Sequence, residues 1–232
     1  MHQNDEDISS RKVAGLIDHT LLKATATSEQ IEQLCSQAKD YGFYSVCVNG
    51  RWVSFAAEEL RGAGVKICSV VSLPLGADST KVKISAAREA ILSGADEIDM
   101  VADLAAVTEG DEKYLAAQFQ AVRRVCRSLR AEVVIKVIIE AAALPMDRKL
   151  FVCGVAERSG VDFIKTSTGM HEAGGATAQD VRLIKQAAPS VKVKAAGGIK
   201  TAADALEMIH AGADRIGTSS GVEIINQLLS SR

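Results

Sequence analysis

The sequence predicts a single (β/α)8 barrel, and three observations carry this prediction. Eight apolar segments with strand character alternate with eight segments of helical period, and no linker or change of composition interrupts them. The length of 232 residues suits one compact barrel with short loops. No Gly-x-Gly-x-x-Gly follows the first strand, which argues against the alternative, an open doubly wound sheet.

The predicted strands are short aliphatic runs that end in polar residues or glycine. They lie at 13–20, 44–49, 65–72, 97–101, 133–140, 162–168, 191–198 and 215–218. The predicted helices lie from 27 onward, at 51–61, 80–93, 112–129 and 146–158, from 177, from 201 and after 221. We expect one domain over residues 1–232, in which residues 1–10 form a short polar lead.

Capping residues set the limits of these elements. Three helices open on a threonine or serine whose side chain can accept from the first free N–H groups, at Thr27, Thr177 and Thr201. A Gly-x-Asp tripeptide precedes three of the strands, beginning at Gly94, Gly160 and Gly212. A glycine there is typical of a helix C-terminal cap, and its recurrence supports a repeated β–α unit.

Composition excludes several classes of function. The net charge of −2 does not favour nucleic acid or an anionic membrane as partner, and no apolar run reaches the length of a membrane span. The acidic N-terminus does not resemble a signal peptide, so we expect a cytoplasmic protein. The five cysteines form no Cys-x-x-Cys pair and are interpreted as reduced core residues. The four histidines show no metal-binding spacing, so no metal site is predicted.

The alternation of side chains along the strands predicts a polar barrel interior. In 133–140, Ile135 and Val137 share one face and Lys136 lies on the other. Because the apolar face should meet the helices, the face that carries Asp99, Lys136 and Lys194 should point to the barrel axis. Lys165 is assigned to the inward face by analogy with these residues, because its own strand shows no clear alternation. The alternatives are a lysine at a strand end that reaches solvent, and a structural ion-pair network.

Lys165 lies in a strand that runs directly into Thr166-Ser167-Thr168-Gly169. Lysine is rare in strands and almost never fully buried without a partner. A dry interior and a second nearby cation would lower the pKa of Lys165 and leave an amine nucleophile. The residues alone do not distinguish Lys165 from Lys194 in this role.

Two glycine-rich loops predict a phosphate site. Gly197-Gly198 follows the seventh predicted strand, and Gly217-Thr218-Ser219-Ser220-Gly221 includes the end of the eighth. Glycine permits close approach of the backbone, and free N–H groups at a helix N-terminus attract anions. The loops after these two strands are the usual phosphate position in a barrel, so we expect a phosphorylated ligand.

The chain resembles the deoxyribose-phosphate aldolase family of class I aldolases nearly end to end. The clearest match is Phe163-Ile164-Lys165-Thr166-Ser167-Thr168-Gly169, the strand and loop around the candidate lysine. The other matching stretches lie at 17–23, 41–49, 73–76, 94–101, 136–140, 194–199 and 215–219.

The resemblance implies reversible cleavage of 2-deoxy-D-ribose 5-phosphate to D-glyceraldehyde 3-phosphate and acetaldehyde, in the catabolism of deoxyribose phosphate. It implies that Lys165 forms the Schiff base, and that Lys194 and Asp99 donate and accept protons. No metal or cofactor is implied. A homo-oligomer, a dimer or tetramer, is expected.

The resemblance also implies a set of substrate contacts. Those at the phosphate are Thr168, Gly169, Gly197, Gly198, Ser219 and Ser220, and the others are Asp18, Thr20, Cys47 and Lys136. From the residues alone, Asp18 and His19 fit either the mouth of the site or a hydrogen-bond network at a strand end. Cys47 reads as a core residue. Some family members have a lysine where this chain has Met170, so one phosphate contact is expected to be missing.

Two other functions compete with this one. A different phosphosugar lyase, isomerase or aldolase would share the glycine loops, but the combination of Asp99, Lys165 and Lys194 favours imine chemistry. A sensor or scaffold for a phosphorylated ligand would need only the loops. A buried amine gives a pure binder no advantage, which argues for an enzyme.

Overall fold

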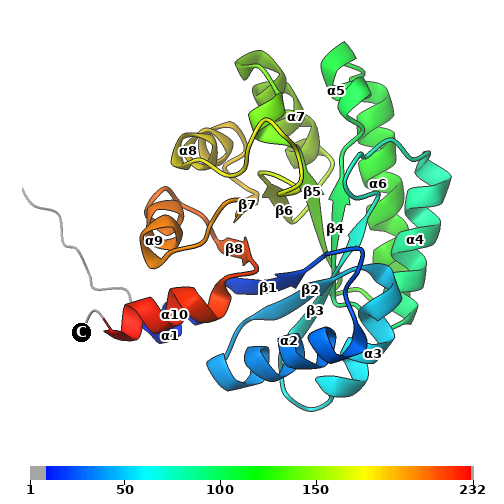
Figure 1. Cartoon of the computed structure of the whole chain (residues 1–232). Coiled ribbons are helices and arrows are strands. Elements are labelled where there is room, and N and C mark those ends of the chain that lie inside the picture. Colours follow the sequence, from blue (N-terminus) through cyan, green and yellow to red (C-terminus); the bar gives the residue numbers. More distant parts are fainter. Residues whose placement is uncertain (1–8, 231–232) are drawn as a thin grey trace, which may run out of the picture.

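The computed structural model describes residues 9–230, which form a closed barrel of eight parallel strands surrounded by helices (Figure 1). Each strand pairs with the next along the chain, and β8 pairs with β1 to close the barrel. The strands are β1 (Ile17–Leu21), β2 (Ser45–Val48), β3 (Lys66–Val71), β4 (Glu97–Val101), β5 (Val134–Ile138), β6 (Phe163–Lys165), β7 (Lys192–Ala196) and β8 (Arg215–Thr218). The predicted barrel is therefore confirmed.

The helices form the outer layer. They are α1 (Ser10–Ala14), α2 (Ser28–Tyr41), α3 (Val53–Glu59), α4 (Thr80–Leu92), α5 (Leu104–Glu109), α6 (Glu112–Leu129), α7 (Met146–Arg158), α8 (Ala178–Ala187), α9 (Ala202–His210) and α10 (Gly221–Ser230). Two single turns of 3-10 helix, η1 (Gly50–Trp52) and η2 (Ala141–Ala143), follow β2 and β5. Threonine caps begin α2, α8 and α9 as predicted.

The predicted strand at 13–20 is wrong in its first half. Ser9 accepts a hydrogen bond from Lys12 N–H, and the chain from Ser10 to Ala14 is helix α1. Four apolar residues with a glycine do not distinguish a strand from a helical turn, because both patterns bury Val13 and Ala14. Most of the polar lead expected at 1–10 lies outside the described residues, and Ser9 and Ser10 belong to the start of α1.

The recurring Gly-x-Asp tripeptides fix the amino ends of the strands. In each, the aspartate precedes a strand, and its carboxylate accepts a hydrogen bond from a backbone N–H near the start of the neighbouring strand. Asp96 accepts from Ile67 at 2.9 Å, Asp162 from Ile135 at 2.8 Å, and Asp214 from Val193 at 2.8 Å. These contacts satisfy backbone donors where the ladder begins.

The apolar core lies between the barrel and the helices, as the alternation predicted. Ile98, Met100, Ile135 and Val137 are fully buried in it. The opposite strand faces fill the barrel interior with polar and charged side chains. Within residues 9–230, no helix combines the length and apolar character required to cross a bilayer.

Candidate active site

A cavity of about 340 Å³ opens at the carboxyl ends of β6, β7 and β8 and the loop after β1. Lys165, the last residue of β6, is 2% exposed and lines this cavity. The rim is formed by Thr168, Gly169, Gly197, Gly198 and Ser219. The glycine loops after β7 and β8 therefore share one cavity with the candidate lysine.

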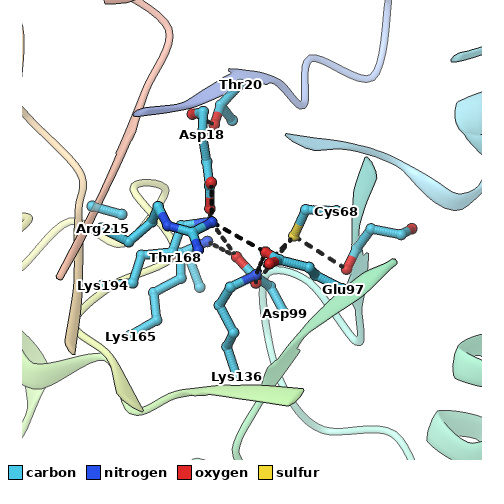
Figure 2. A network of polar contacts seen from close by, with 12 residues as sticks. Asp18, Thr20, Cys68, Glu97, Asp99, Lys136, Lys165, Thr168, Lys194 and Arg215 are labelled. Carbon is cyan, nitrogen blue, oxygen red and sulfur yellow. Dashed lines mark hydrogen bonds and ion pairs between the residues drawn. The ribbon is translucent and has the colours of Figure 1, made fainter. Parts of the chain in front are cut away.

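Asp99 is the centre of the buried polar network beneath this cavity (Figure 2). Its Oδ2 accepts hydrogen bonds from Lys165 Nζ at 3.0 Å and from Lys194 Nζ at 2.8 Å. Its Oδ1 accepts from Lys136 Nζ at 2.8 Å and from the thiol of Cys68 at 3.1 Å. One carboxylate thus holds three ammonium groups from β5, β6 and β7.

A second group of charges lies against Lys194. Asp18 Oδ2 is 2.5 Å from Lys194 Nζ, and Asp18 Oδ1 accepts from Arg215 at 2.8 Å and from Ser45 Oγ at 2.6 Å. Arg215 also reaches Glu97 Oε2 at 3.4 Å, and its guanidinium lies over the Tyr44 ring. Glu97 in turn pairs with Lys136 at 2.5 Å. Among the described residues, the ion-paired cluster therefore contains three carboxylates and four cations.

The ionic contacts override the effect of burial on these groups. Burial alone would raise the pKa of Asp99, but Lys136, Lys165 and Lys194 hold that pKa well below its usual value. Burial likewise opposes the charge on Lys194, yet the carboxylates of Asp18 and Asp99 raise its pKa above the ordinary lysine value. The pKa of Lys136 is also raised, chiefly by Asp99 against burial. Lys136 and Lys194 are therefore held as cations.

Glu140 shapes the loop at the rim. It lies just after β5 with a φ of 51°, a left-handed conformation that is uncommon outside glycine. Its buried carboxylate accepts from the Thr168 hydroxyl at 2.6 Å and from the Thr168 N–H at 3.2 Å. This anchor holds the turn at Thr168-Gly169 against the cavity. Among the described residues, Glu140 has no cation within ion-pair distance.

Two glycines are required by close packing. A Cβ on Gly197, whose φ is 92°, would lie 3.1 Å from the Cα of Gly169 and 3.0 Å from that of Gly175. The loops after β6 and β7 therefore touch backbone to backbone beside the cavity. A Cβ on Gly217 would lie 2.9 Å from Cε of Lys194, so this glycine leaves room for the lysine side chain.

The structure brings the predicted residues together in two layers. The cavity is lined by Thr20, Lys165, Thr168, Gly169, Gly197, Gly198 and Ser219. The layer beneath it is fully buried and contains Asp18, Cys47, Asp99, Lys136 and Lys194. Asp18 belongs to a buried hydrogen-bond network with Ser45 and Arg215 and does not line the cavity. Ser220 lies just before α10 and is also outside the cavity lining.

Sequence reasoning missed several residues of the site. Glu97 and Arg215 stand at strand starts, where charged residues are usually solvated, and only barrel closure brings them inside. Lys23 and Lys200 line the cavity beside Met170, and so supply cations where a lysine at 170 is absent. The signal for Lys200 was available, because it lies two residues after Gly198 in the same loop.

Metal ligation is disfavoured by the chemistry of the donors. Sulfur and oxygen atoms of Cys47, Cys68 and Asp99 lie within 4.8 Å of one another. However, Asp99 already contacts three ammonium groups, and burial raises the pKa of the Cys68 thiol well above its usual value. A divalent cation here would be held against lysines and a protonated thiol.

The fold and the cavity define a (β/α)8-barrel protein with a lysine centre at the carboxyl ends of its strands, the end at which barrel enzymes carry out their chemistry. The model of the DeoC/LacD family aldolases matches residues 12–227. The chain belongs to this family and is an aldolase.

Three relatives are similar over almost their full length. Deoxyribose-phosphate aldolase from Carboxydothermus hydrogenoformans is 47% identical over 96% of this chain and 98% of its own. The Streptococcus uberis enzyme of the same name is 48% identical, over 93% and 96%. The tetrameric structure of deoxyribose phosphate aldolase from Aeropyrum pernix has a TM-score of 0.89 at 31% identity, covering 99% of this chain and 100% of that one.

Proposed function

We propose that this aldolase cleaves 2-deoxy-D-ribose 5-phosphate reversibly to D-glyceraldehyde 3-phosphate and acetaldehyde, through a Schiff base on Lys165. The names of its relatives support the reaction. The cavity supports the substrate class, because its lining combines Lys165, the glycine loops and the cations of Lys23 and Lys200. Such a sugar would be supplied by the breakdown of deoxynucleosides.

The observation that carries the choice of nucleophile is that Lys165 alone of the three lysines around Asp99 lines the cavity. Lys136 and Lys194 are fully buried and held as cations by carboxylates. The ion-paired cluster has one cation more than its carboxylates. Loss of one proton from Lys165 would balance it and leave a neutral amine facing the substrate.

The chemistry then follows from the amine. Lys165 Nζ adds to the aldehyde carbon of the open-chain sugar, and loss of water gives an iminium ion. This cation withdraws electrons as the C3 hydroxyl loses its proton and the C2–C3 bond breaks, which releases glyceraldehyde 3-phosphate. The enamine that remains takes a proton at C2, and water then hydrolyses the new iminium to acetaldehyde and free Lys165.

Asp99 and Lys194 assist this sequence from the buried side. Asp99 contacts both Lys165 and Lys194 through one oxygen, so it connects the reacting nitrogen to a proton donor. Its low pKa keeps it a carboxylate, which stabilises the iminium charge. Lys194 supplies protons during dehydration and enamine protonation, either through a water molecule or through Asp99, which carries the proton only in passing.

The phosphate end of the substrate is assigned to the rim. Gly169, Gly197, Gly198 and Ser219 offer backbone groups, and Lys23 and Lys200 offer charge. Ser220 precedes α10, whose N-terminal turn carries a partial positive charge. The other predicted contacts, Asp18, Cys47 and Lys136, would act through the buried layer.

Reductive trapping tests the assignment. We expect borohydride with acetaldehyde to attach an ethyl group to Lys165, located by peptide mass mapping, and Lys165→Met to lose both the label and turnover. A label on Lys194 would overturn the choice of nucleophile. An absence of label together with activity that needs a divalent metal would reject the imine mechanism.

Assembly and location are proposed on separate grounds. Because the Aeropyrum pernix relative is tetrameric, we propose a homo-oligomer, a dimer or tetramer, which analytical ultracentrifugation will test. A cytoplasmic location remains a prediction from the sequence.

A further inference from the structure

We infer that the groove between α6 and α7 is a second anion site, which binds a phosphorylated sugar or similar small phosphate ester away from the aldol centre. A cavity of about 580 Å³ lies there, and Figure 1 shows the two helices in the outer layer. Its lining is Gln120, Arg123, Arg124, Arg127, Ser128, Arg158, Ser159 and Gly160. None of these residues lines the aldol cavity.

The cavity has uncompensated positive charge. Arg127 pairs with Asp162 at 2.5 Å and Arg158 with Glu112 at 2.7 Å. Among the described residues, Arg123 and Arg124 have no carboxylate partner within ion-pair distance. Four guanidinium groups therefore meet two ion-paired carboxylates, and the carboxylate of Glu157 acts on Arg158 from nearby, so positive charge still exceeds negative charge around the cavity.

Three buried polar atoms point independently to a missing ligand. Arg123 Nε, Arg127 Nε and Ser159 Oγ have no hydrogen-bond partner among residues 9–230, and they belong to three residues that line the cavity. Ser159 is only 4% exposed. A buried unsatisfied donor costs about 1–3 kcal/mol, so three in one cavity require an explanation. An oxyanion satisfies such donors, because guanidinium N–H groups match phosphate oxygens in pairs.

The competing explanation is a solvated helix end. Arg127 and Arg158 lie in the last turns of α6 and α7, where cations offset the negative end of the helix dipole. That role and their ion pairs account for these two arginines. It does not account for Arg123, nor for the unpartnered hydroxyl of Ser159.

The lining also selects among anions. It holds no aromatic side chain on which a base could stack, which argues against nucleotides and single-stranded nucleic acid. Gln120, Ser128 and Ser159 offer hydrogen-bonding groups suited to hydroxyls. The volume lies in the range of about 300–1,000 Å³ typical of small-molecule sites and exceeds the need of one phosphate ion.

The test must resolve the two anion sites of the chain, so it reads the arginine Nε–H signals directly by NMR. Full-length protein is titrated with inorganic phosphate, glucose 6-phosphate, dAMP and a short single-stranded DNA, with sodium chloride at matched ionic strength as reference. We expect saturable shifts of the Arg123 and Arg127 Nε–H signals, with glucose 6-phosphate binding more tightly than phosphate or dAMP.

Variants separate binding from structure. We expect Arg123→Gln to weaken glucose 6-phosphate binding at least about tenfold, and Ser159→Ala about threefold or more, with melting temperature and aldol turnover retained. Arg88→Gln removes the same charge from the exposed face of α4 and should change the affinity less than about twofold.

The proposal fails if the Nε–H shifts do not saturate, or if chloride reproduces them at equal ionic strength. It also fails if Ser159→Ala raises the melting temperature without changing affinity, because the hydroxyl is then merely unsatisfied. Tighter binding of DNA or dAMP would show that the ligand class is wrong.

Discussion

Lys194 Nζ lies 2.5 Å from Asp18 Oδ2, in a contact that joins the first and seventh strands across the barrel interior. It fixes the charge of Lys194, whose pKa is raised by Asp18 and Asp99 despite burial. Lys165 has no contact with Asp18 and meets only Asp99 among these carboxylates. The difference in ion pairing between Lys194 and Lys165 therefore comes from Asp18, which lies 176 positions before Lys194 in the chain.

We expect Asp18→Asn to lower the free energy of unfolding by about 3 kcal/mol and to reduce turnover at least tenfold, because a buried cation pair loses its carboxylate. Urea unfolding and steady-state kinetics measure the two effects. Ser45→Ala is the matched control: it removes a 2.6 Å hydrogen bond to the same carboxylate without a change of charge, at about 1 kcal/mol. Equal effects of the two variants would contradict the electrostatic role of Asp18.

We expect Lys194→Met to abolish turnover and to cost about 3–5 kcal/mol of stability, because Asp18 and Asp99 both lose a cation. Lys194→Arg restores the charge, so it should regain stability and remain inactive, since a guanidinium is not deprotonated in a protein and cannot act as a proton donor and acceptor. Turnover and urea unfolding are measured on both variants. Activity in Lys194→Arg would show that Lys194 acts by charge alone.

We expect Glu140→Gln to raise KM for deoxyribose 5-phosphate about tenfold, with a smaller effect on kcat, because the Thr168 turn loses its anionic acceptor. The cleavage of unphosphorylated deoxyribose should change little. Glu157→Gln serves as control, because Glu157 accepts the same pair of contacts from Ser190, at 2.9 and 2.6 Å, outside the site. A parallel change with both sugars would contradict a role at the phosphate.

Lys83 predicts a pH dependence of stability. Its Nζ donates to Val101 O at 2.8 Å and to Gln118 Oε1 at 2.9 Å, and burial lowers its pKa from 10.5 to about 8. Because the folded pKa lies below the unfolded value, the unfolded chain binds more protons between these values, and stability from this group rises with pH from about 8.

Relative to Lys83→Met, the wild-type chain should therefore gain about 1 kcal/mol between pH 7 and pH 9. Urea unfolding of both proteins at each pH measures this difference. The buried thiols, such as Cys35 with a pKa raised by burial to about 11, titrate in both proteins and cancel. A difference that is independent of pH would show that Lys83 is not neutralised in the fold.

Patterns in the sequence were enough to predict the barrel, the order of its strands and the inward face that carries Asp99, Lys136 and Lys194. These follow from the alternation of side chains along the strands and from the Gly-x-Asp tripeptides that recur before strands, which are local properties of the chain. The sequence did not predict the helix at Ser10–Ala14, because a short apolar run fits the period of a helix as well as that of a strand. The strand β6 is also shorter than predicted: Thr166 still donates to Lys194 O of β7, but Thr168 turns away to bind the Glu140 carboxylate.

The pairing of the buried charges, in contrast, depends on the closed barrel. Closure of the barrel sets Asp18 and Arg215 beside Lys194, Glu97 beside Lys136, and Glu140 beside Thr168. Electrostatic effects depend on distances of a few ångströms between strands far apart in sequence, and no local pattern records those distances. For the same reason, only the packing of α6 against α7 brings Arg123, Arg127 and Arg158 around one cavity.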